Sequence, residues 1–204
     1  MPRFVAVILA GGGASRMGGG DKPLLELGGR TMLGRLVDAF APRAAMLAIS
    51  ANADARGTTG AARFAAFGLP VLPDEAPFAG HGPLAGLLAG LDWAAAQGEA
   101  LLLTVPGDTP FLPPDLAALL APAPSYAACD GRDHPLTALW PVASREALRA
   151  WLVAQPGRSV ARFAALLGSR RHTFAPERRE WFRNINTPDE LFVARDILER
   201  SPSM

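Results

Sequence analysis

The 204-residue chain has a single cysteine, no excess of charge of either sign and no long apolar run. With only Cys129 present, an internal disulfide and a cysteine-based zinc site are excluded. The formal net charge is +1 and neither half carries a Lys/Arg run, which argues against a generic nucleic-acid binder. No stretch approaches the roughly 20 apolar residues that span a bilayer. We therefore expect one cytoplasmic domain over residues 1–204, with no membrane or nucleic-acid partner.

Short apolar runs alternate with segments of helical periodicity in the first part of the chain. Buried strands are expected at Phe4–Leu9, Ala45–Ser50, Val71–Leu72 and Ala100–Val105. Helices are expected at Thr31–Ala41, Leu84–Ala96 and Asp115–Leu120. This alternation predicts an α/β fold, a Rossmann-like three-layer sandwich with a mostly parallel sheet. Residues 53–63 are expected to form a mobile loop.

The pattern changes after PAPS at residues 122–125. A strand pair, Tyr126–Cys129 and Leu136–Trp140, is expected around a turn at DGRDHP (130–135), followed by helices at Ser144–Ala154, Ser159–Leu167 and Asp189–Leu198. The one local excess of charge comprises Arg170, Arg171, Arg178, Arg179 and Arg183, interleaved with Glu177 and Glu180. We interpret it as a solvated face, with an anionic ligand or partner as the alternative.

A glycine-rich loop follows the first expected strand, since residues 6–29 read AVILAGGGASRMGGGDKPLLELGG. Ordering clustered glycines is costly, so the pattern indicates a ligand that comes close to the main chain. The loop lacks the Gly-Lys-Ser/Thr of a P-loop, and Arg16 stands where a dinucleotide fingerprint has its last glycine. Free N–H groups with Arg16 and Lys22 nearby would suit a chain of phosphates. The alternative is a merely flexible loop.

Asp108 lies in VPGDTPFLPP, directly after an apolar strand, so we expect it at that strand's carboxyl end. Ligands of open α/β sheets bind at this edge. A carboxylate opposite a phosphate cradle is suited to hold Mg²⁺ between the protein and a triphosphate. Its alternative role, capping the turn through Thr109, is compatible with metal binding.

The segment LAGGGASRMGGGDKPLLELGG resembles the signature of nucleotidyltransferases, which move a nucleoside monophosphate from an NTP onto a phosphate acceptor. More narrowly, the chain resembles the molybdenum cofactor guanylyltransferase family, which joins GMP to molybdopterin. Five further segments match in order: PDE at 73–75, GPLAG at 82–86, PGDTPFLPPDL at 106–116, DGRDHPLTALW at 130–140 and NINTPDEL at 184–191. The resemblance implies a nucleotide-diphospho-sugar-transferase-like fold. We expect residues 1–121 to bind nucleotide and residues 122–204 to bind the acceptor.

The resemblance also implies roles for individual residues. It makes Asp108 the metal ligand, and it favours Asp74 as the reader of guanine N1–H and the exocyclic amine over a plain turn aspartate. The nucleotide-binding set that we expect comprises Leu9, Ala10, Gly11, Gly12, Gly13, Lys22, Asn52, Asp74, Gly82 and Asp108. Gly11 favours GTP by analogy, because cytidylyltransferase relatives tend to carry LAAG in place of LAGG. The chain departs from the family at residues 50–52, which read SAN where the family segment resembles NAN. Either Ser50 or Asn52 therefore contacts the nucleotide.

Two other pairs of residues each fit two different roles. Gly82 and Gly86 flank the start of a helix, where either a ligand or tight helix–sheet packing requires a small residue. Asn184 and Asn186 flank an apolar residue, and they either grip a polar pterin or its phosphate or satisfy turn backbone. His134 is too isolated for metal binding, and we expect it to be structural or near the acceptor.

The expected reaction is Mg²⁺-dependent in-line attack by the terminal phosphate of molybdenum-molybdopterin on the α-phosphorus of GTP, with pyrophosphate leaving. The attacking group is already an anion, which fits the absence of a convincing Ser/His/Asp or Cys/His set. Catalysis would come from positioning and charge neutralisation by Arg16, Lys22 and Asp108. The alternatives are a cytidylyl- or sugar-phosphate nucleotidyltransferase of the same fold, or a non-catalytic nucleotide or pterin carrier. Docking to molybdenum-insertion proteins or molybdoenzymes is expected by analogy only.

Overall fold

A computed structural model describes residues 3–11, 21–54, 56–154 and 159–200, so the predicted site residues Gly12, Gly13 and Arg16 lie outside the described residues. Within the described ranges, seven strands form one sheet in the order β5-β4-β1-β6-β8-β7-β9. Their bounds are β1 Val5–Leu9, β4 Leu47–Ser50, β5 Val71–Leu72, β6 Leu101–Pro106, β7 Ser125–Cys129, β8 Arg132–Pro141 and β9 Arg170–Phe174. All neighbours are parallel except β8, which runs antiparallel to β6 and β7. The predicted mostly parallel sheet is confirmed.

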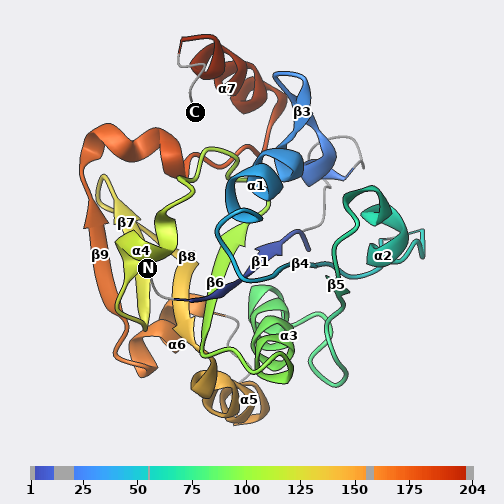
Figure 1. The fold of residues 1–204 in the computed structure, drawn as a ribbon, viewed down its shortest axis with the longest axis vertical. Helices are drawn as coiled ribbons and strands as arrows, with labels where there is room; N and C mark the ends of the chain where they lie inside the picture. The colour runs from blue at the N-terminus through green and yellow to red at the C-terminus, as the bar shows by residue number, and fades with distance from the viewer. Residues whose placement is uncertain (1–2, 12–20, 55, 155–158, 201–204) are drawn as a thin grey trace.

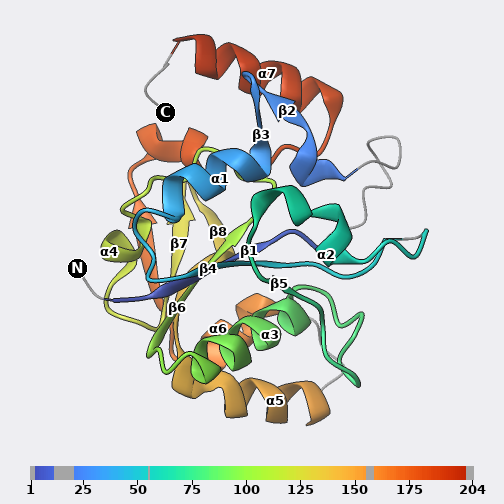
Figure 2. The ribbon, with the colours of Figure 1, turned by 45° about the vertical axis from the view of Figure 1, so that its right-hand side comes forward.

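Helices cover both faces of this sheet, which gives the predicted three layers (Figures 1 and 2). The helices are α1 Met32–Phe40, α2 Gly60–Arg63, α3 Pro83–Ala96, α4 Leu116–Leu120, α5 Arg145–Ala154, α6 Val160–Leu166 and α7 Pro188–Arg200. Short 3₁₀ helices lie at η1 Lys22–Leu24, η2 Ala65–Phe67, η3 Val142–Ser144 and η4 Pro176–Phe182. In Figure 2, α1 lies above the sheet and α3, α5 and α6 lie below it, while α7 lies over the small hairpin β2 Glu26–Leu27 and β3 Arg30–Thr31.

The core follows from the burial of β1 on both of its faces. Ile8 packs with Leu36 and Phe40 of α1 on one face, and Val7 packs with Leu87 of α3 on the other. Burying a side chain of this size contributes about 1.5–3 kcal/mol. A third cluster joins the hairpin and α7 to the loop after β6, and it comprises Leu27, Met32, Phe111, Ile185 and Ala194. This third cluster brings the C-terminal segment to the edge of the sheet where β6 ends.

The loop predicted at residues 53–63 is wrong at its end, because residues 60–63 form α2. The Thr59 hydroxyl accepts a hydrogen bond from the Ala62 N–H, which caps the helix. Gly60 allows α2 to start against β4, since a Cβ there would stand 2.5 Å from the Ala51 carbonyl oxygen. A four-residue helix carries too little periodicity to be found by pattern.

Two further differences concern the C-terminal part of the sheet. The turn predicted at 130–135 is shorter, because Asp130 and Gly131 have φ of 49° and 74° and β8 begins at Arg132. Strand β9 was not predicted, because exposed arginines occupy its first positions. The six predicted helices at residues 31–41, 84–96, 115–120, 144–154, 159–167 and 189–198 are confirmed to within two residues at each end. Across the described ranges, no helix combines the length and the apolar character that a membrane span needs.

Candidate functional site

The predicted nucleotide-binding residues that the structure describes gather around the carboxyl ends of β5, β4, β1 and β6. The Gly107 N–H donates to the Leu9 carbonyl at 3.0 Å, and the Ala10 N–H donates to the Ser50 carbonyl at 2.9 Å. These bonds continue the strand pairing past the end of β1. Gly11, Asn52, Asp74 and Asp108 therefore follow neighbouring strands at one edge, which is where open α/β sheets bind ligands.

Lys22 and Asp108 meet at this edge. The Lys22 ammonium donates to Asp108 Oδ2 at 2.7 Å and also to the Asn186 side-chain oxygen. The Lys22 side chain is 15% exposed and that of Asp108 is 23% exposed, so the pair is accessible to a ligand while being largely shielded from bulk water. Two residues predicted as catalytic and one predicted to bind the acceptor are thus in direct contact.

The surrounding chain holds this cluster in position. The Ile185 N–H donates to the Asp108 carbonyl at 2.9 Å, which anchors NINTPDEL beside the end of β6. Glu190 accepts hydrogen bonds from the N–H groups of Asn186 and Thr187, and the Glu190 N–H donates to the Thr187 hydroxyl. This is the reciprocal arrangement of a capping box, so the start of α7 fixes the backbone at Asn186.

Thr109 makes the turn contact with Asp108 that the alternative role of Asp108 predicts. Its hydroxyl lies 3.3 Å from Asp108 Oδ1 and 3.2 Å from the Asn184 side-chain oxygen, and the residue is buried. Asp108 Oδ1 contacts this turn while Oδ2 faces Lys22. The turn contact and a ligand role for Asp108 are therefore compatible. Asn184 itself is exposed, and its side chain adjoins the turn rather than Lys22.

Asn52 and Asp74 form a second, reciprocal pair. Asn52 Nδ2 donates to Asp74 Oδ2 at 2.6 Å, and the Asp74 N–H donates to Asn52 Oδ1 at 2.7 Å. Ser50, the other residue considered for this position, is buried beneath α3 instead. A Cβ on Gly86 would stand 2.6 Å from the Ser50 hydroxyl, so Gly86 serves helix–sheet packing. Gly82, by contrast, is exposed and immediately precedes α3 as its N-cap, with a φ of 68°.

Arg63 belongs to this region and was not predicted. Its guanidinium forms a two-pronged ion pair with the Asp21 carboxylate and donates through Nη1 to the Asn52 carbonyl at 2.8 Å. Asp21 immediately precedes Lys22. No sequence pattern marks Arg63, because it lies in the segment expected to be a loop and its partners are 42 and 11 positions away.

The C-terminal arginines form the predicted solvated face, since four of the five are exposed, and their guanidinium groups also contact neighbouring protein groups. Arg170 donates to the carbonyls of Leu120 and Ala121, and Arg171 pairs with Asp133 at 2.6 Å. Arg179 and Arg183 both pair with Glu180, and Arg178 stacks over the Trp181 ring at 4.4 Å. The Arg183 guanidinium lowers the pKa of Glu180 through its hydrogen bonds.

His134 lies in β8 and stacks on the buried Phe182 ring, with centroids 4.9 Å apart. Burial lowers the pKa of His134, and the positive charge of Arg132 lowers it further. A neutral imidazole packed on an aromatic ring fits a structural role. Nothing in these contacts places a ligand at His134.

The position of Asp108 fits the coordination of a Mg²⁺ ion. Across the described ranges there is no cluster of three or more His, Cys, Asp or Glu that could enclose a metal by itself. Mg²⁺ is commonly held by one or two carboxylates together with water and substrate phosphates. A single accessible carboxylate at a ligand-binding edge fits that form of coordination.

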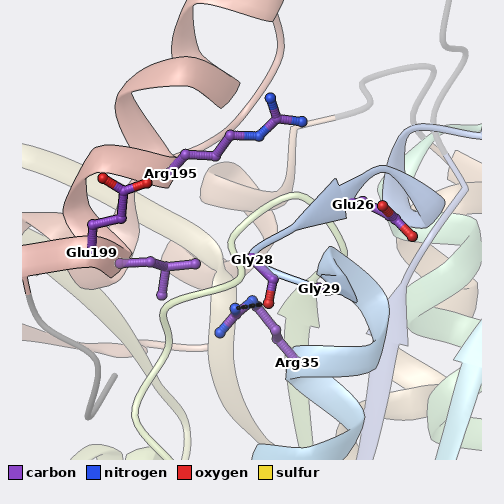
Figure 3. A pocket seen from close by; sticks show the side chains of 7 residues that line it. Glu26, Gly28, Gly29, Arg35, Arg195 and Glu199 are labelled. Carbon is purple, nitrogen blue, oxygen red and sulfur yellow. Dashed lines mark hydrogen bonds between the residues drawn. The ribbon is translucent and has the colours of Figure 1, made fainter.

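A hollow of about 540 Å³ lies away from these residues, between the β2–β3 hairpin and α7 (Figure 3). It is lined by Glu26, Gly28, Gly29, Arg35, Arg195, Leu198 and Glu199. Arg35 donates to the Leu27 and Gly28 carbonyls, so much of its hydrogen-bonding capacity is used by the hairpin. None of the predicted site residues that the structure describes lines this hollow.

Fold and site together define a class: an α/β protein whose ligand-binding sheet edge carries a lysine paired with a metal-compatible carboxylate. The profile of the MobA-like NTP transferase domain matches residues 6–172. The chain belongs to this family, and it is a nucleotidyltransferase. The predicted family resemblance is thereby confirmed.

Relatives and solved structures agree with this assignment. The chain is 50% identical over 189 residues to the molybdenum cofactor guanylyltransferase of Acidiphilium cryptum, with 93% of this chain and 92% of the relative covered. It is 47% identical to the enzyme of that name from Cereibacter sphaeroides, with 97% and 98% covered. The crystal structure of molybdopterin-guanine dinucleotide biosynthesis protein A from Archaeoglobus fulgidus shares the fold, with a TM-score of 0.71, 21% identity and 97% and 99% coverage.

Proposed function

We propose that the protein transfers GMP from GTP to the terminal phosphate of molybdenum-molybdopterin, forming molybdopterin guanine dinucleotide and releasing pyrophosphate. The observation that carries this proposal is the Lys22–Asp108 pair, which lies at the same sheet edge as the Asn52–Asp74 pair. One pair suits a metal-bound phosphate chain and the other suits a base. We take guanine as the base and the molybdenum cofactor as the acceptor from the names of the full-length relatives, which are 43–50% identical to this chain.

In this proposal Asp74 reads the base. Its Oδ2 accepts from Asn52, which orients the carboxylate, and the remaining lone pairs of Oδ1 and Oδ2 would accept from guanine N1–H and the exocyclic amine. Asn52 then acts by holding Asp74 as well as by contacting the nucleotide. Backbone groups of Leu9, Ala10 and Gly11 complete the base side, and Gly12, Gly13 and Gly82 belong to the phosphate and ribose side.

The reaction forms a bond between an acceptor phosphate oxygen and the α-phosphorus of GTP and breaks the bond from that phosphorus to the oxygen that leaves with pyrophosphate. Asp108 would hold Mg²⁺, which supplies charge neutralisation at the α-phosphate when bound. Lys22 and Arg16 would stabilise the charge that develops on pyrophosphate. Lys22 is paired with Asp108, so this contact would bring the phosphate-binding cation next to the proposed metal ligand.

The acceptor would bind on the side contributed by residues 122–204, with Asn184 and Asn186 facing its phosphate or pterin. Asn186 supports this placement because it touches Lys22 and so adjoins the place where the two substrates must meet. We assign the nucleotide to residues 1–121. The proposed setting is the cytoplasm, with molybdenum-insertion proteins or molybdoenzymes as recipients of the product.

The test is pyrophosphate release with Mg²⁺ and GTP, CTP or ATP in parallel, each with and without molybdenum-loaded molybdopterin. Release with GTP but not with CTP or ATP, and only when the pterin is present, would support the proposal. Release with CTP would retain the reaction type and overturn the assigned base. Nucleotide binding without release under any pairing would support a carrier instead.

The acceptor assignment has its own test. Asn186→Ala should raise the KM for the pterin while the KM for GTP stays within about twofold, because a contact made only to the acceptor affects only its binding. If Asn186→Ala instead raises the KM for GTP, then Asn186 acts through Lys22 and the acceptor role is wrong.

A further inference from the structure

Arg63 contacts protein partners through all three of its guanidinium nitrogens at the edge of the proposed nucleotide site. Nε donates to Asp21 Oδ2 at 2.9 Å, Nη2 donates to Asp21 Oδ1, and Nη1 donates to the Asn52 carbonyl at 2.8 Å. All three guanidinium nitrogens are therefore used. These bonds commit three of its five N–H donors to protein groups, so we look for its contribution in the groups that it holds.

These groups belong to the two functional parts of the site. Asp21 is the residue before Lys22, which pairs with Asp108. Asn52 is reciprocally bonded to Asp74, the proposed reader of the base. Arg63 therefore links the phosphate side of the site to its base side, although the two sides come from segments that are distant in the sequence.

The helix that carries Arg63 is itself held firmly in place. Gly60 packs α2 directly on the Ala51 carbonyl, and the buried Phe64 anchors the other end of the helix. The guanidinium lies 5.1 Å from the Phe64 ring centroid, which is within the range of a cation–π contact. The side chain of Arg63 is only 12% exposed, so little of it is free to reorient.

Charge gives Arg63 a second effect on the same site. Without it, the Asp21 carboxylate, 23% exposed, would lack its cationic partner one residue from the lysine proposed to neutralise the triphosphate. A like charge close to an anionic ligand opposes binding, and screening by solvent is reduced for groups that are partly buried.

We propose that Arg63 is a positioning residue for the nucleotide, which sets the placement of Lys22 through Asp21 and that of Asp74 through Asn52. This inference rests on the proposed function, since it assigns the two linked groups to the phosphates and base of one nucleotide. It predicts that loss of Arg63 impairs nucleotide binding more than acceptor binding.

The test compares Arg63→Gln with a matched control, Arg149→Gln. Arg149 pairs with Asp92 at 2.7 Å, and it joins α5 to α3 on the far face of the sheet from α1. Both variants lose one partly buried Arg–Asp pair, so both should lower the unfolding midpoint. Only Arg63→Gln should weaken GTP binding, titrated with Mg²⁺ and no acceptor, and lower kcat/KM for GTP, by about 10- to 100-fold. The KM for the pterin should stay within about twofold.

Arg63→Lys separates geometry from charge and serves in place of Arg63→Gln if that variant does not fold. It retains the cation but cannot make the three bonds of a planar guanidinium, so GTP binding should still weaken. The inference is overturned if both Arg63 variants bind GTP within twofold of the wild type, or if Arg149→Gln weakens GTP binding equally.

The wild-type protein in the same assay distinguishes failure of this inference from failure of the proposed function. If the wild type uses CTP, the assigned base is wrong, and the same comparison is made with CTP. If the wild type binds no nucleotide, the proposed function and the role of Arg63 both fall. If the wild type is active with GTP and the Arg63 variants behave normally, only the role of Arg63 falls.

Discussion

Lys22 and Asp108, 86 positions apart in the sequence, form an ion pair of 2.7 Å at the carboxyl end of β6. The ion pair balances the two charges and, together with the bond from Lys22 to the Asn186 side-chain oxygen, fixes both side chains at this edge. Under the proposed function Lys22 serves the phosphates and Asp108 the metal, so this contact would hold the two groups next to each other.

Replacing Lys22 by alanine should reduce kcat by roughly 10²–10³, in line with the loss of other groups that stabilise transition-state charge. The measurement is the initial rate of pyrophosphate release at saturating GTP and acceptor. Arg30→Ala is the control, because it removes an exposed cation paired with Asp38 and should leave the rate within about twofold. A Lys22→Ala variant with full activity would show that the lysine has no catalytic role.

Replacing Asp108 by asparagine should abolish the contribution of Mg²⁺ to GTP binding, because a neutral amide is a much poorer magnesium ligand than a carboxylate. Calorimetric titration of GTP with and without Mg²⁺ should show tightening by the metal in the wild type and none in the variant. Asp38→Asn, a change in an exposed carboxylate, should behave as the wild type does. Equal tightening in Asp108→Asn would contradict the metal assignment.

Replacing Gly86 by alanine should destabilise the fold by about 1–3 kcal/mol, because overpacking forces buried groups apart. The new methyl group would stand 2.6 Å from the Ser50 hydroxyl and 3.4 Å from a Leu9 methyl. This cost should exceed the gain of about 1 kcal/mol that alanine brings to a helix interior. In a Ser50→Ala background the clash is relieved, so adding Gly86→Ala should be neutral or stabilising. Urea unfolding of the four proteins measures both effects, and a stabilised Gly86→Ala single variant would refute the packing argument.

The fold should lose stability as the pH falls from 7.5 to 5.5, partly through His134. Burial, followed by the charge of Arg132, lowers the pKa of His134 in the folded protein below its ordinary value of about 6.5. Below that value the unfolded chain takes up a proton that the folded protein resists, so the stabilisation present above pH 6.5 is lost as the pH falls.

The measurement for His134 is the urea midpoint at the two pH values for the wild type and His134→Gln. The drop in midpoint should be smaller in the variant. Part of the drop should remain, because burial also lowers the pKa of His172. An identical drop in both proteins would show that His134 does not contribute.

Much of the α/β architecture could be predicted from local patterns. Strands such as β1 are uniformly apolar because they are covered on both faces, and α1 carries its apolar residues on one side because only that side meets the sheet. Such signals depend on neighbours within a few residues. They fail for α2, which is too short to show a period, and for β9, whose exposed arginines hide its place at the edge of the sheet.

The chemistry of the site could be predicted in part. The glycine-rich loop, Lys22 and Asp108 stand in motifs whose order resembles a known family. Their residue types and spacing therefore predict, from sequence, a site for a phosphate chain and a metal ion. Gly12, Gly13 and Arg16 stay predictions, since they lie outside the described residues. The alternatives at Gly86 could not be separated from sequence, because the distance to Ser50 depends on how α3 lies on β4.

The sequence by itself determined the fold class and the enzyme family, and it predicted the residues proposed to carry the chemistry, because each of these depends on residue type, order and short-range period. Only the tertiary structure decided which of these residues touch. It joined Lys22 to Asn186, paired Asn52 with Asp74 and bonded Arg63 to both Asp21 and Asn52. The physical reason is that such contacts are made between chain segments far apart in sequence, and they form only when sheet order and helix packing bring those segments to one edge.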